Sequence, residues 1–235
     1  MRTWALPLIP ALALAVAWHG SAPAQDKDGF TPLFNGKDLS GWKPYLPPAK
    51  GKPDAVPDPK NTWSIEDGYI RCVGKPAGYI ATEKEHGNYI LRLKWRFPAD
   101  SKGGNSGVLL HVTGPDRVWP NSVEAQLAAG QAGDFWLIGD AKGMLPKLDI
   151  EQSRKDPKNK EGRHYFRVNR EEKVEKPFGE WNQYEITCKG GDVTLKINGK
   201  QVNQGANGEL KSGRIALQSE GAEVHFKDIE IAPIR

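Results

Sequence analysis

The stretch YILRLKWRF, residues Tyr89–Phe97, alternates apolar and basic side chains over most of its length. Successive side chains of a β-strand point to opposite faces, so one face of this segment is apolar and the other carries three positive charges, from Arg92, Lys94 and Arg96. This pattern is typical of a half-buried antiparallel strand. It predicts a sheet with its core on one side.

The same alternation recurs on both sides of this segment. Short β-patterns separated by turn dipeptides such as Asp67-Gly68 and Asn198-Gly199 occupy 62–82, 107–127, 181–203 and 213–231. No amphipathic helix of ordinary length interrupts them. Many short strands joined by Gly-rich turns predict an all-β fold, and their number favours a jelly-roll β-sandwich of two antiparallel sheets.

Residues 1–24 predict a secretory signal peptide. Arg2 precedes an apolar run from Ala5 to Trp18, and Ala22-Pro23-Ala24 fits a small-x-small cleavage site. The apolar run is short for a membrane span. We therefore expect cleavage after Ala24 and a single exported domain at 25–235, periplasmic or secreted and free of the membrane.

Charge and cysteine content exclude several partners. The formal net charge of +4 comes from 33 basic and 29 acidic residues mixed along the chain, which does not predict nucleic-acid binding. Cys72 and Cys188 have no Cys or His neighbours at zinc-ligand spacing, and no Asp/Asn-rich loop specifies calcium. The sequence thus predicts no metal or cofactor, and it leaves open whether the two cysteines form a disulfide.

The candidate site lies in Gly103–Ala128, GGNSGVLLHVTGPDRVWPNSVEAQLA. This stretch predicts two strands, Gly107–Val112 and Ser122–Leu127, joined by a turn-rich connection. Alternation places Glu124 and Gln126 on one face of the second strand, opposite its apolar side chains. His111 interrupts the apolar first strand. The irregular, charged region 134–180 that follows is either a solvated excursion or a cover over a site.

Several motifs resemble one known family. They are FNGKDLSGW at 34–42, Gly104-Asn105-Ser106-Gly107, Glu124-Ala125-Gln126, Gly179-Glu180-Trp181-Asn182, Val193 to Gly199, and the closing segment Gly213–Ile231. Together they resemble the 3-keto-disaccharide hydrolase domain, over nearly all of 25–235 and in the same order. The resemblance implies a concanavalin A-like jelly roll that hydrolyses glycosides oxidised at C3. It departs at His111, where the family pattern has arginine.

A ketone at C3 makes the C2 proton acidic, so a base can form an enolate and the C1 substituent can leave by elimination before water adds. We expect Glu124 to be the base or acid, with His111 as the second proton-transfer group. Arg92, Lys94 or Arg96 would stabilise the enolate, with Arg96 the preferred candidate. The remaining substrate-binding candidates are Asn105, Gln126 and Gln218 as hydrogen-bonding groups, and Trp136 as a ring that stacks on the sugar.

Two other functions fit the same residues. Glu220 keeps the parity of Gln218, and with Glu124 it would form the carboxylate pair of a conventional glycosidase. A non-catalytic carbohydrate-binding module would use the aromatic and amide side chains without needing Glu124. Each polar residue also has a structural interpretation: a carboxylate on a solvated strand face, a hydrogen-bonded core histidine, or a solvent-exposed basic stripe.

Overall fold

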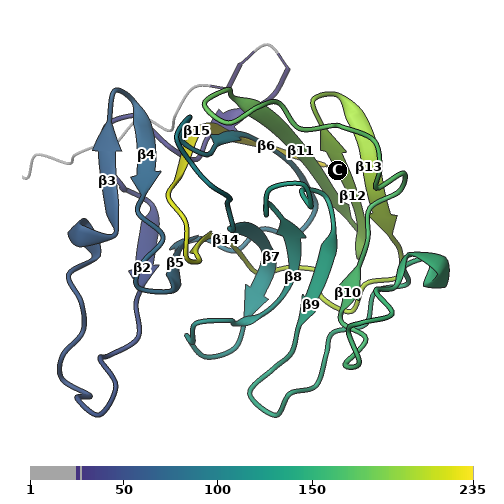
Figure 1. Cartoon of the computed structure of the whole chain (residues 1–235), viewed down its shortest axis with the longest axis horizontal. Helices are drawn as coiled ribbons and strands as arrows, with labels where there is room; N and C mark the ends of the chain where they lie inside the picture. Colours follow the sequence, from purple (N-terminus) through teal and green to yellow (C-terminus); the bar gives the residue numbers. More distant parts are fainter. Residues whose placement is uncertain (1–24, 27, 235) are drawn as a thin grey trace, which may run out of the picture.

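The computed structural model describes residues 25–26 and 28–234, and the predicted signal peptide lies outside these described residues. The chain forms two antiparallel sheets (Figure 1), which confirms the predicted all-β jelly-roll class. The helical elements in the described part are two short 3₁₀ turns, η1 (Pro59–Asn61) and η2 (Gln152–Arg154). None of the helices there is long and apolar enough to span a membrane.

One sheet has eight strands in the order β13-β12-β11-β6-β15-β4-β3, with β1 also pairing with β15. The strands are β1 (Thr31–Pro32), β3 (Trp63–Glu66), β4 (Tyr69–Cys72), β6 (Tyr89–Arg96), β11 (Asn182–Lys189), β12 (Asp192–Ile197), β13 (Lys200–Gly205) and β15 (Val224–Pro233). The alternating segment that opened the sequence analysis is therefore a central strand, β6, which pairs with β11 and β15.

The other sheet has seven strands in the order β10-β9-β8-β7-β14-β5-β2, and Figure 1 shows β7, β8 and β9 running side by side. Its strands are β2 (Trp42–Tyr45), β5 (Gly78–Thr82), β7 (Gly107–Thr113), β8 (Asn121–Gln126), β9 (Phe135–Ile138), β10 (His164–Tyr165) and β14 (Arg214–Ser219). The two strands predicted within Gly103–Ala128 are thus neighbours, β7 and β8, at the centre of this sheet.

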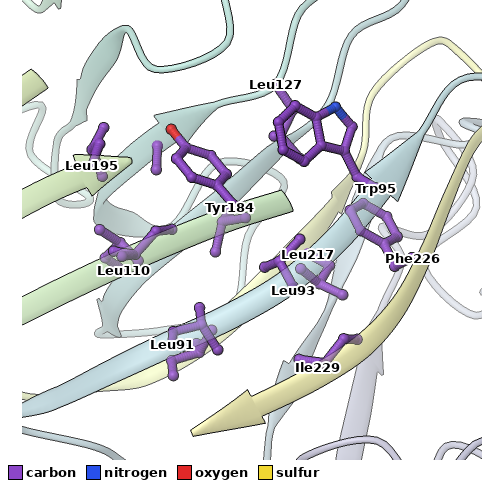
Figure 2. Close-up of a cluster of buried hydrophobic side chains, with 14 of the residues drawn as sticks. Leu91, Leu93, Trp95, Leu110, Leu127, Tyr184, Leu195, Leu217, Phe226 and Ile229 are labelled. Atoms are coloured by element: carbon purple, nitrogen blue, oxygen red, sulfur yellow. The ribbon is translucent and has the colours of Figure 1, made fainter. Parts of the chain in front are cut away.

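The main core lies between the sheets. Leu91, Leu93 and Trp95 of β6 project into it, and Leu110 and Leu217 enter from the seven-stranded sheet (Figure 2). Burial of each such side chain stabilises the fold by about 1.5–3 kcal/mol, which is why the alternating sequence holds its register.

Cys72 and Cys188 are both buried and both free. They lie in β4 and β11, and β15 and β6 separate these two strands in the sheet. Three strand spacings amount to about 14 Å, whereas a disulfide needs Cα atoms within about 7 Å. The disulfide that the sequence left open does not form.

The seven-stranded sheet also buries residues on its second face, away from the main core. A smaller apolar cluster covers part of that face: Tyr79, Ala81, Leu109, Val112, Ile138 and Ala216. Glu124 and Gln126 of β8, and Gln218 of β14 on the other side of β7, are also buried and have the parity of this second face. Buried polar groups beside an apolar cluster indicate that this face carries a functional site.

Candidate functional site

A cavity of about 1000 Å³ opens over β8 and β9 on this second face. Its floor includes Glu124, Gln126 and Trp136, and its walls come from two loops, 117–119 and 139–145, and from residues 161–163. Arg117 ties the two loops together, because its guanidinium donates to the carbonyl oxygens of Trp119 and Gly139. Five of the predicted site residues line the cavity: Asn105, Glu124, Gln126, Trp136 and Glu220.

Glu124 is the most deeply placed carboxyl of the cavity. It is only 5% exposed, and its Oε1 has no hydrogen-bond partner within the described part of the chain. Burial raises the pKa of Glu124 well above its ordinary value, the negative charge of Glu220 raises it further, and the positive charge of Arg163 opposes both effects. A carboxyl group in this environment is suited to exchanging protons near neutral pH.

Glu220 follows β14 and faces the same cavity. Its Oε1 accepts a hydrogen bond of 3.1 Å from the indole Nε1 of Trp119, in the loop between β7 and β8. Burial raises the pKa of Glu220, and the bond from Trp119 partly counteracts that rise. The cavity therefore holds two carboxyl groups whose pKa values are both shifted upward.

Trp136 lies directly across from Glu124 in the β8–β9 pair. One face of its ring stacks on His164, with the ring centroids 4.2 Å apart and the planes inclined by 12°. His164 is held between two carboxylates, Asp134 at 2.9 Å and Asp156 at 3.0 Å. This contact leaves at most the other face of Trp136 for stacking on a sugar.

Arg163 precedes β10 and lines the cavity beside Trp136, with its Cζ 5.5 Å from the indole centroid. Trp136 Nε1 is buried and lacks a hydrogen-bond partner among the described residues. Arg163 Nε lies 3.0 Å from Glu161 Oε2, so Arg163 is ion-paired at the cavity wall. Buried donors without partners carry a desolvation cost that a bound oxygen would relieve. The Trp136 N–H is therefore a candidate donor to an oxygen atom of a substrate, and the Arg163 guanidinium supplies a positive charge beside it.

Gln126 is held in place by its own turn. Its Oε1 accepts hydrogen bonds from the backbone N–H groups of Leu127 at 2.8 Å and Ala128 at 2.9 Å. Its side chain nevertheless reaches the cavity surface. Gln218, in contrast, is 1% exposed and lies behind Glu124 rather than on the cavity wall.

His111 does not reach this site. A bulge between Leu110 and Thr113 interrupts the pairing of β7 with β8, and His111 adopts a left-handed φ of 51° within it. Its ring nitrogens face the carbonyl oxygens of Leu210 at 2.9 Å and Gly87 at 3.1 Å. The prediction that His111 faces the sugar with Glu124 is corrected, because the bulge breaks the alternation on which it depended.

Arg96 is also excluded from the cavity. It extends from the outer face of the eight-stranded sheet, where its Nε donates to His225 Nδ1 and its guanidinium lies 4.5 Å from the Trp181 centroid. On the same face Arg92 pairs with Glu185, and Lys94 pairs with Asp228. The expected enolate-stabilising cations thus belong to the other sheet, because alternation separates two faces without showing which one borders a cavity.

The cations that do line the cavity are Arg117, Lys142 and Arg163, and the sequence analysis did not single them out. All three lie in loops, where no periodicity predicts the direction of a side chain. The sequence feature that could have indicated Arg163 is its location in the irregular region 134–180, which was predicted to be either a solvated excursion or a cover over a site. Over the described residues, no three His, Cys, Asp or Glu side chains are grouped so as to hold a metal ion.

Comparison with solved structures shows the fold class of the protein. A carbohydrate-binding module from Bacillus subtilis shares the fold with a TM-score of 0.54 at 10% identity, covering 82% of this chain and 95% of that one. A β-glucanase from Bacillus licheniformis shares it with a TM-score of 0.50 at 11% identity, covering 88% and 97%. Both identities are low, so these neighbours show the fold of the chain, a jelly-roll β-sandwich.

The family follows from the sequence matches. Residues 29–232 match the profile described as the 3-keto-alpha-glucoside-1,2-lyase-like domain, and the chain belongs to this family. A 3-keto-disaccharide hydrolase of Bacteroides thetaiotaomicron is 26% identical over 248 residues, covering 88% of this chain and 79% of that protein. A glycosyl hydrolase candidate from Parabacteroides distasonis is 27% identical, with a TM-score of 0.59 over 88% of this chain and 95% of that one. These matches support a glycoside hydrolase-type activity.

Proposed function

We propose that this protein cleaves the glycosidic bond of glycosides, disaccharides included, whose sugar carries a ketone at C3. The observation that carries the proposal is Glu124, a buried carboxyl with an unpartnered oxygen and a raised pKa in a cavity of about 1000 Å³. The family match and the named activity of the Bacteroides relative support the C3 ketone as the feature that the substrate carries.

In the proposed mechanism, Glu124 removes the proton from C2 of the sugar. The electron pair of the C2–H bond moves into the adjacent C3 carbonyl and forms an enolate. A carboxylate in a desolvated setting is a stronger base than one in water, because its conjugate acid has a raised pKa. The depth of Glu124 in the cavity is thus the property that suits it to this step.

Arg163 and Trp136 would stabilise the enolate oxygen. The unpartnered N–H of Trp136 and the guanidinium of Arg163, which is paired with Glu161 at 3.0 Å, already lie at the cavity wall. Both therefore need little reorganisation to face a developing negative charge. The positive charge of Arg163 is the natural partner for an enolate. Arg163 therefore takes the enolate-stabilising role that the alternating pattern predicted for Arg92, Lys94 or Arg96.

Glu220 would complete the reaction at the leaving group. As the enolate collapses, the bond from C1 to the leaving oxygen breaks, and protonated Glu220 donates a proton to that oxygen. Trp119 holds Glu220 in place through its indole N–H. Water then adds across the resulting C1–C2 double bond: its oxygen bonds to C1 and its released proton returns to Glu220. Glu124, whose carboxyl proton has exchanged with solvent, protonates C2, and the sum is net hydrolysis.

The deciding experiment incubates the purified protein with a 3-keto-disaccharide and, in parallel, with the unoxidised parent sugar. Release of the 3-keto monosaccharide from the first substrate alone is expected. In deuterated water, elimination and hydration place deuterium at C2 of the product, whereas direct displacement by two carboxylates leaves C2 unlabelled. Cleavage of both sugars at equal rates would contradict the requirement for the ketone.

Export is a second part of the proposal, and it rests on residues 1–24. When the full chain is expressed in a bacterial host, the mature protein is expected in the periplasm or medium and should begin at Gln25. N-terminal sequencing of that fraction tests the cleavage site. An intact N-terminus on protein recovered from the cytoplasm would contradict it.

A further inference from the structure

Glu124 and Gln218 meet over a glycine at the centre of the seven-stranded sheet. Gly107 lies in β7, between β8, which carries Glu124, and β14, which carries Gln218. A Cβ atom at Gly107 would lie 2.3 Å from Glu124 Oε1 and 2.4 Å from Gln218 Oε1. The two side chains therefore occupy the volume that any other residue at position 107 would fill.

The two oxygen atoms beside that volume have no hydrogen-bond partner among the described residues, and no hydrogen bond joins them to each other. Glu124 Oε1, Gln218 Oε1 and Gln218 Nε2 are all buried and unpaired within the part of the chain that the structure describes. Such buried polar atoms cost about 1–3 kcal/mol each when they stay unsatisfied. A hydrogen bond between Glu124 and Gln218 would satisfy Glu124 Oε1 and one of the two Gln218 atoms.

An amide can make this bond in either protonation state of the carboxyl group. A protonated Glu124 has an O–H that donates to Gln218 Oε1. An ionised Glu124 is an acceptor only, and a half-turn of the amide presents Nε2 to it instead. The other charged groups that act on Glu124 are Glu220 and Arg163. Arg163 can only donate, and Glu220 changes from donor to acceptor only by losing its own proton.

We propose that Gln218 is a positioning residue that hydrogen-bonds Glu124 in both protonation states by rotating its amide, and that Gly107 provides the space in which they meet. The inference rests on the proposed function for its catalytic consequence, since a group that takes and returns a proton in each turnover needs a partner in both states. Gln218 then acts through Glu124, behind the cavity wall. This role differs from the predicted one, in which Gln218 binds sugar hydroxyls.

Gln218→Met tests this directly, because methionine keeps the length of the side chain and removes both hydrogen-bonding groups. The bond to an ionised acceptor is the stronger of the two, so its loss raises the pKa of Glu124. We expect kcat to fall by about tenfold, KM to change by less than about threefold, and the pH limb that requires ionised Glu124 to move to higher pH. The matched control is Gln183→Met, at an exposed position of β11, where none of these values should change.

Gly107→Ala approaches the same contact from the opposite side. Its methyl group would separate the two oxygens, and the backbone there needs no left-handed conformation. We therefore expect the pH limb that requires ionised Glu124 to move to higher pH, as in Gln218→Met.

If Gln218→Met does not fold, Gln218→Glu keeps the size of the side chain and places a second carboxyl beside Glu124. That variant should raise the pKa of Glu124 still further.

Titration of Glu124 by isotope-edited NMR in the free protein separates this inference from the proposed function, because it needs no substrate. A raised Glu124 pKa in Gln218→Met supports the inference even if no sugar is cleaved. An unchanged Glu124 titration overturns it. A higher KM with an unaltered pH profile also overturns it, and it would assign Gln218 to substrate binding.

Discussion

Glu124 and Glu220 face the same cavity. Glu124 lies in β8 and Glu220 directly follows β14, and β7 separates these two strands in the sheet. The negative charge of Glu220 raises the pKa of Glu124 beyond the effect of burial. Two carboxyl groups coupled in this way lose their protons in steps that belong to the pair. The first proton leaves and the pair retains the second, mostly on the more deeply buried Glu124. The proposed reaction starts from the other placement of that proton, on Glu220, which leaves Glu124 ionised as the base.

Glu220→Gln should lower the pKa of Glu124 toward its ordinary value, because the neighbouring negative charge is removed. In the pH dependence of kcat/KM, the limb that requires ionised Glu124 should then move to lower pH. The rate itself should fall by about 10²–10⁴, the contribution of a general acid. Glu85→Gln, at an exposed position away from the cavity, is the matched control and should leave the pH dependence unchanged. A limb that stays in place would show that Glu220 does not act on Glu124.

Glu124→Gln should abolish turnover and retain sugar binding. The amide preserves the shape of the side chain and cannot take a proton from C2, so kcat is expected to fall by about 10²–10⁴. Binding of the 3-keto substrate, measured by calorimetry, should stay within severalfold of the wild type. Unchanged turnover would remove Glu124 from the mechanism, whereas a wild-type protein that binds the sugar and never cleaves it would indicate a binding module.

The same variant should be more stable than the wild type at neutral and alkaline pH. Because the folded-state pKa of Glu124 is raised, the stabilisation from its neutral form is present below the unfolded pKa of about 4.3 and is lost as pH rises through the folded pKa. Denaturation at pH 8 should show a gain on the order of 1–3 kcal/mol for Glu124→Gln, which shrinks toward zero near pH 4. A difference that does not vary with pH would contradict this prediction.

His111→Ala should reduce stability and leave catalysis intact. The imidazole is buried between two backbone carbonyl groups and packs edge-on against Tyr89, so its loss is expected to cost about 2 kcal/mol. The kcat of the folded fraction should stay within about threefold of the wild type. Loss of kcat by two orders of magnitude in a well-folded variant would return His111 to the mechanism.

The pH dependence of stability provides a second test of His111. Burial lowers its pKa in the folded state, so its contribution is present above the unfolded pKa of about 6.5 and is lost as pH falls through the lower folded value. The wild type should therefore lose more stability between pH 7 and pH 5 than His111→Ala does. Parallel curves for the two proteins would contradict burial of a neutral imidazole.

Reducing agents should not affect the thermal stability of the protein, because Cys72 and Cys188 are too far apart in the sheet to form a disulfide. Burial raises the pKa of the Cys72 thiol to about 11 and that of Cys188 to about 12. Both thiols should resist iodoacetamide in the native state and react once the chain is unfolded. Mass spectrometry should then find two alkylated cysteines without prior reduction.

The sequence by itself determined the fold class and most of the strands. In Tyr89–Arg96 the side-chain pattern and the buried pattern coincide, because a residue that faces the core must be apolar whatever else the sheet contains. Alternation likewise predicted that Glu124 and Gln126 share a face. The motifs at 34–42, 104–107 and 124–126 were sufficient to point to the family, while the signal peptide stays a prediction.

Only the tertiary structure decided which polar groups meet. Alternation divides a strand into two faces and does not show which face borders a cavity. Arg96 was therefore predicted to face the substrate, whereas it lies on the outer face of the eight-stranded sheet. One additional residue in a bulge reverses parity, and this turned His111 away from Glu124. Arg163 and Gly107 act through neighbours that are distant in sequence. Their roles depend on the register between strands, which is set by long-range packing and is not encoded in any local pattern.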